Sequence, residues 1–81
     1  MAKKIKQKIY NFTTIFESAE EGGYIVYVPA LPGCATQGET FEEAEGMAKD
    51  VIKGYLKTMQ DLKEEIPIES KTIISRILVA V

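Results

Sequence analysis

The chain has 81 residues, of which 46% are hydrophobic and 27% charged, and its formal net charge is −2. These values fit one small globular domain and exclude a disordered chain, and no apolar run approaches the roughly 20 residues of a membrane span. The absence of histidine and the presence of a single cysteine, Cys34, exclude an internal disulfide and every catalytic or metal site that needs histidine. A reduced cysteine suits the cytoplasm, where we expect this protein to work.

Two short β-rich runs open the chain, and a polar link that ends in two glycines joins them. From residue 8 to 17, aromatic and β-branched side chains alternate with a period of two, and Tyr24 to Val28 is a second β-rich run. Because the link over residues 18–23 is short and its glycines tolerate positive φ, the two runs are predicted to form an antiparallel hairpin.

A compact turn follows at residues 29–34, with the sequence Pro-Ala-Leu-Pro-Gly-Cys. Pro29 lacks a backbone N–H and therefore ends the second strand or marks a sheet edge. Residues 34–37 are predicted to form a short third strand, closed by Gly38 and antiparallel to the second. We expect the turn to be a structural hinge first and a contact surface second, with Gly33 at positive φ.

From Thr40 to about Leu62 the chain is predicted to form one long amphipathic helix. Thr40 and Glu43 match the capping box, in which the two side chains accept hydrogen bonds from exposed N–H groups at the helix start. Apolar residues recur every three or four positions, as in a helix that lies on a sheet. This stripe consists of Ala44, Ala48, Val51, Tyr55, Met59 and Leu62. Pro67 prevents the helix from continuing beyond Ile66.

The last segment, residues 71–81, is rich in isoleucine and valine on both faces of an extended chain. We expect a fourth strand here, parallel to the third because the helix joins the two through a right-handed crossover. The predicted fold is therefore α+β, β-β-β-α-β, with a mixed four-stranded sheet in the order 3-2-1-4 and one helix on one face. Since the fourth strand would be an edge and one sheet face would stay open, we expect a homo-oligomer, a dimer or tetramer. The residues expected to carry this self-association are Ile74, Arg76, Ile77 and Val79.

A set of spaced residues runs in register through the second and third strands, the turn and the helix start. It consists of Gly23, Tyr24, Val26, Val28, Pro29, Leu31, Pro32, Gly33, Cys34, Thr36, Gly38, Thr40, Glu43 and Ala44, followed by Ile66-Pro67-Ile68-Glu69. From about Ile9 to Val79 the chain thereby resembles the HicB-like antitoxin family. The resemblance implies a truncated ribonuclease H-like fold and an antitoxin that binds and occludes a HicA-type mRNA-cleaving toxin.

Many members of that family carry a DNA-binding domain after this fold, whereas the last residue of this chain is Val81. We therefore expect a single HicB-like domain over residues 1–81, without a C-terminal DNA-binding domain.

The residue pattern predicts no catalytic site. Ribonuclease H chemistry needs a cluster of carboxylates that hold two divalent metals, but the first strand offers only Glu17 and the second has no acid. Cys34 has no histidine to activate it as a nucleophile. We expect no enzyme activity, no metal and no cofactor.

Protein binding is the function that we expect, and an acidic antitoxin would be steered electrostatically toward a basic toxin. The candidate partner-binding residues surround the turn and are Tyr27, Pro29, Leu31, Pro32 and Cys34. The alternative is a nucleic-acid-binding or regulatory HicB-like protein without a toxin, using the basic N-terminus with Lys3, Lys4 and Lys6, or a residual nuclease. No membrane partner is expected.

Overall fold

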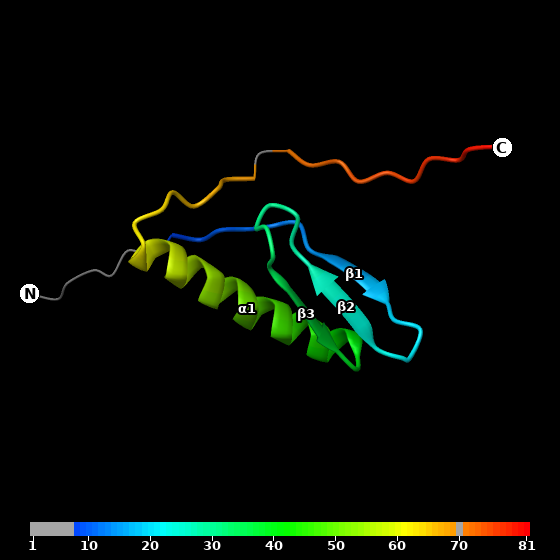
Figure 1. The fold of residues 1–81 in the computed structure, drawn as a ribbon, viewed down its shortest axis with the longest axis horizontal. Coiled ribbons are helices and arrows are strands. Elements are labelled where there is room, and N and C mark those ends of the chain that lie inside the picture. Colours follow the sequence, from blue (N-terminus) through cyan, green and yellow to red (C-terminus); the bar gives the residue numbers. More distant parts are fainter. Residues whose placement is uncertain (1–7, 70) are drawn as a thin grey trace, which may run out of the picture.

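The computed structural model describes residues 8–69 and 71–81, and it consists of a small sheet covered on one face by a helix (Figure 1). The elements in chain order are β1 (Ile15–Ser18), β2 (Tyr24–Tyr27), β3 (Ala35–Gly38) and α1 (Phe41–Asp61). The three strands form one antiparallel sheet in the order β1-β2-β3. The predicted hairpin, third strand and helix are confirmed, whereas the lysines of the basic N-terminus lie outside the described residues.

β1 extends less far toward the N-terminus than predicted. Ile15 pairs with Tyr27, and this pair is the last one of the β1–β2 ladder. The Val28 amide faces β3 and donates to the Cys34 carbonyl at 3.1 Å, and the next residue, Pro29, has no N–H to donate toward β1. The chain before Ile15 therefore has no strand beside it with which to pair.

The predicted fourth strand is wrong, and with it the mixed four-stranded sheet of order 3-2-1-4. The described part of the chain contains three strands, all antiparallel. Residues 71–81 run past β1 without joining the sheet (Figure 1), and all of them are exposed. A run of isoleucine, valine and leucine indicates a chain that can form a strand, but a strand exists only where a neighbour supplies hydrogen bonds and packing. Within the described residues this segment has no such neighbour.

The first of two core clusters lies between the sheet and the N-terminal half of α1. It consists of Val26, only 1% exposed, with Ala44 and Ala48, which are the two buried residues of the helix. The predicted apolar stripe thus begins where it was expected. A Cβ built on Gly38 would lie 2.5 Å from the Ala44 nitrogen, so only glycine allows β3 to approach the helix start this closely.

Local signals define both ends of α1. The Glu43 amide donates to the Thr40 hydroxyl at 3.0 Å, which confirms the predicted N-cap. The Glu43 carboxylate accepts from the Glu39 amide at 3.3 Å, one residue before the position that a capping box uses. The helix ends at Asp61, and Lys63 follows with φ at 56°, the left-handed conformation that terminates many helices.

After α1 the chain returns to the segment that precedes β1 and is anchored there by Glu69. The Thr13 amide donates to Glu69 Oε2 at 2.8 Å, and the Thr13 hydroxyl donates to Oε1 of the same carboxylate. These hydrogen bonds favour the charged form and lower the pKa of the Glu69 carboxyl. The point from which residues 71–81 leave the fold is therefore defined.

Acidification should weaken the hydrogen bonds between Thr13 and the Glu69 carboxylate. Because the pKa of Glu69 is lower in the folded chain, its contribution is complete above the ordinary glutamate pKa of about 4.3 and is lost as the pH falls through the lower folded value. We expect the NMR shift of the Thr13 amide to titrate in that acidic range, and the Glu69→Gln variant to lose this titration. A Thr13 shift that is equally pH-dependent in the variant would contradict the assignment.

Candidate protein-binding surface

The turn between β2 and β3 is closed by its own backbone. Leu31 donates its amide to the Val28 carbonyl at 3.0 Å, and Cys34 donates its amide to the Leu31 carbonyl at 2.9 Å. The Tyr55 hydroxyl on α1 donates to the Pro32 carbonyl at 2.9 Å. The turn is therefore held both internally and against the helix.

The inner side of this turn forms the second core cluster. Leu31 is 1% and Cys34 3% exposed, and both pack with Val28. The side chains around this cluster are Phe12, Val51, Ile52, Tyr55 and Leu56. Burial of the Cys34 thiol also raises its pKa, which lowers the fraction of reactive thiolate.

The five residues predicted to bind a partner do not share one surface. Leu31 and Cys34 have their side chains in the core, while Pro29 and Pro32 are exposed on the turn. Tyr27 is also exposed, but it follows buried Val26 along β2 and so lies on the sheet face away from α1. Contact of these residues with a partner stays a prediction, and only the exposed three offer side chains for it.

The sheet face away from α1 has no cover within the described residues, and we call it the open sheet face. By the strand register it consists of Ile15, Glu17, Ile25, Tyr27, Ala35 and Gln37. Ile25 is 46% and Tyr27 36% exposed. The nearby Glu17 carboxylate, by hydrogen bonding and by its charge, raises the pKa of Tyr27. This face therefore combines apolar side chains with one acidic group.

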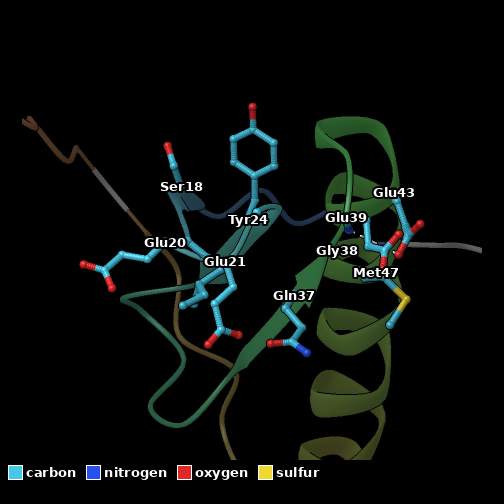
Figure 2. A pocket seen from close by; sticks show the side chains of 12 residues that line it. Ser18, Glu20, Glu21, Tyr24, Gln37, Gly38, Glu39, Glu43 and Met47 are labelled. Atoms are coloured by element: carbon cyan, nitrogen blue, oxygen red, sulfur yellow. Dashed lines mark hydrogen bonds between the residues drawn. The ribbon is translucent and has the colours of Figure 1, made fainter.

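An acidic cleft lies at the end of the strands opposite the turn at residues 29–34 (Figure 2). The sequence did not predict this surface. It is bounded by the β1–β2 turn on one side and by the start of α1 on the other. Glu20 and Glu21 extend from the turn, and Glu39 and Glu43 from the helix start (Figure 2). The sequence signal for this cleft is two separate acidic groups, which the pairing of β2 with β3 brings together.

The electrostatics of the acidic cleft suit a positively charged partner. None of the described residues that line it is basic, so its four carboxylates give the cleft a net negative charge. Tyr24 and Met47 add apolar surface to its wall. Such a combination can bind a lysine- or arginine-bearing surface of another protein.

The described residues contain no group of three or more histidine, cysteine, aspartate or glutamate side chains that could hold a metal ion. No helix in the described part of the chain is long and apolar enough to cross a membrane.

Comparison with known proteins identifies one family. A sequence model described as the HicB_like antitoxin of bacterial toxin-antitoxin systems matches residues 12–78. A UPF0150 protein of Thermoplasma acidophilum is 45% identical over 56 residues, which cover 69% of this chain and 81% of that protein. A UPF0150 protein of Synechocystis is 36% identical over 63 residues, covering 78% and 80%. Antitoxin HicB 1 of Photorhabdus laumondii is 38% identical over 61 residues, which cover 75% of this chain but 39% of that protein.

We expect position 33 to need glycine because of its backbone conformation, and not because a larger side chain would clash. Its φ is +78°, and a Cβ would meet no atom within 4 Å. We expect Gly33→Ala to lower the free energy of unfolding by about 1 kcal/mol or more, because an L-residue is disfavoured at this φ. The matched control is Gly46→Ala, since Gly46 lies within α1 and a Cβ there also has open space. This control should raise the free energy by roughly 0.5–1 kcal/mol in the same denaturant titration. Equal effects of the two substitutions would refute the interpretation.

Cys34 should be protected from thiol reagents in the folded protein. Its burial and its raised pKa both reduce the exposed thiolate, so modification by iodoacetamide at pH 8 should be at least about tenfold slower than in denaturant. A Ser18→Cys variant, which places a thiol on the exposed end of β1, should react at its second thiol without denaturant. Rapid modification of Cys34 in the folded wild-type chain would show that the turn opens readily.

Proposed function

The chain belongs to the HicB-like antitoxin family, and on that basis we propose that it binds a HicA-type mRNA-cleaving toxin and neutralises it by covering the toxin's active site. The proposal assigns no catalytic activity to the chain itself. Its support is that the sequence has no histidine and that its one cysteine is buried. We also propose that it works in the cytoplasm, where a toxin that cleaves mRNA finds its substrate.

The acidic cleft is the observation that carries this proposal. A protein that cleaves RNA must bind a polyanion, so the surface around its active site is expected to be basic. The carboxylates of Glu20, Glu21, Glu39 and Glu43 form a complementary negative surface on this chain. Charge complementarity of this kind accelerates association and selects the partner, even where it adds little to affinity.

We assign the exposed side of the turn, with Pro29 and Pro32, to the same interface. Its support is that Leu31 and Cys34 anchor the turn in the core, which lowers the conformational entropy that its outer surface would lose on binding. The turn and the acidic cleft lie at opposite ends of β2, whose four residues span about 13 Å. A protein interface of ordinary size covers roughly 800 Å² per partner and can reach both.

We further propose that the chain is a homo-oligomer, a dimer or tetramer. The support is the exposure of Ile74, Ile77 and Val79 in the C-terminal segment, with Arg76 between them. Exposed apolar patches of this kind mark interaction surfaces.

A nucleic-acid-binding role without a toxin is the alternative, and one observation favours it. Lys8, Lys53 and Lys57 surround a depression that Tyr10 also lines, on the C-terminal half of α1. Lysines beside an aromatic ring can bind phosphate and stack on a base. The net charge of −2 acts against this alternative.

The test is inhibition of RNA cleavage by a purified HicA-type toxin encoded next to this chain. We expect cleavage to stop when the chain reaches an equimolar amount, and the chain alone to leave RNA intact in the presence of Mg²⁺. Association should slow as salt is added, because the attraction is electrostatic. A toxin that stays fully active in excess chain would refute the proposal, and RNA binding by the chain alone, lost in Lys53→Glu with Lys57→Glu, would support the alternative.

Charge reversal locates the interface. Glu20→Lys combined with Glu21→Lys should lower the association rate constant by about tenfold or more at low salt. The control pair is Asp61→Lys with Glu65→Lys, two exposed acids near the other end of α1 that do not line the acidic cleft. If both pairs slow association equally, the effect is one of net charge and the acidic cleft is not the contact.

A further inference from the structure

The C-terminal segment, residues 71–81, carries six large apolar side chains that nothing in the described chain covers. They are Ile73, Ile74, Ile77, Leu78, Val79 and Val81, each at least 63% exposed. Isolated exposed apolar residues are ordinary, but in an extended chain four of these six, at positions 73, 77, 79 and 81, share one face and form one apolar surface. A surface of this kind is expected to be covered in the working protein.

Glu69, which precedes this segment, is fixed to the domain, and this limits the positions that the segment can reach. Glu69 is bound to Thr13 through its carboxylate, so the segment leaves the fold just before the start of β1. From there it continues as an extended chain and ends clear of the sheet (Figure 1). Eleven extended residues reach about 36 Å, far beyond the four-residue strands of the chain's own sheet.

The surface that complements this segment is present on the same chain. The open sheet face offers Ile25 and Tyr27, both partly exposed, beside half-buried Ile15. The charges also match: the segment carries Lys71 and Arg76 and no acid. The open sheet face and the adjoining turn carry Glu17, Glu20 and Glu21.

We infer that the C-terminal segment of one copy packs on the open sheet face of a second copy, and that the exchange is reciprocal. Each chain carries one donor segment and one acceptor face, so a two-fold pair covers both on both copies. An unrelated partner with only one of these surfaces would leave the other uncovered. The inference rests on the self-association proposed above, and its acceptor face adjoins the acidic cleft, which Ile25 also lines. Measurements on the chain alone therefore test it without a toxin.

Light scattering on the full chain at micromolar concentration is the first measurement. The chain mass is 9.0 kDa, so a reciprocal pair has twice that mass. Ile77→Lys places a charge in the donor segment and, being on an exposed position outside the core, leaves the fold intact. We expect it to raise the dimer dissociation constant at least tenfold, as should Ile25→Lys in the acceptor face. Leu62→Lys is the matched control, an exposed apolar residue just after α1, and should leave the dimer unchanged.

Mixing the two variants tests the exchange itself. One contact remains possible between an Ile77→Lys chain, whose acceptor face is intact, and an Ile25→Lys chain, whose donor segment is intact. We therefore expect the mixture to dimerise more tightly than either variant alone.

A second measurement leaves Ile25 unchanged, so its result does not depend on whether the Ile25→Lys variant folds. Chains with Arg76→Cys, mixed with chains carrying Glu17→Cys, should be joined by a short bis-maleimide into a species of double mass, while buried Cys34 stays unreacted. A monomeric wild-type chain would overturn both the proposed self-association and the exchange. A dimer that survives Ile77→Lys, or the absence of both mixed dimer and cross-link, would overturn the exchange alone.

Discussion

The close approach of α1 to the sheet is the contact on which the rest of the structure depends. Ala44 and Ala48 present only methyl groups to Val26, and Gly38 has no side chain at all where β3 meets the helix start. Small side chains on both sides let the helix lie directly on strands of only four residues. A larger side chain at any of these positions would lift the helix and open a core that has few other contacts.

The helix is longer than the sheet that it covers, and this difference in length explains why the turn between β2 and β3 packs inward against the helix. Twenty-one helical residues span about 31 Å, whereas the strands span about 13 Å. The second half of α1 would therefore have nothing to pack on, if Leu31 and Cys34 did not fold inward from the turn to meet it. The turn is thus part of the core, and the hydrogen bond from Tyr55 to Pro32 holds it there.

One covered face and one open face divide the small domain into a part that provides stability and a part that is available for binding. The same strand pairing that builds the covered face brings Glu20 and Glu21 opposite Glu39 and Glu43. Because α1 uses its one apolar stripe on the sheet, it cannot also cover the C-terminal segment. The exposed surfaces of the sheet and the turn are therefore those that remain after the core has been built.

Elements whose signals are local could be predicted from the sequence. The helix follows from its apolar period and the Thr40 cap, the hairpin from its glycine-rich link, and the end of β2 from Pro29, because each depends on residues a few positions apart. The three-dimensional fold was needed to show that Leu31 and Cys34 are buried while Pro29 and Pro32 are exposed. The fold also brings two acidic groups together in one cleft. It also decided that residues 71–81 join no sheet. A run of β-branched residues favours an extended chain, but whether that chain becomes a strand depends on a neighbour from elsewhere in the fold, which the local sequence does not contain.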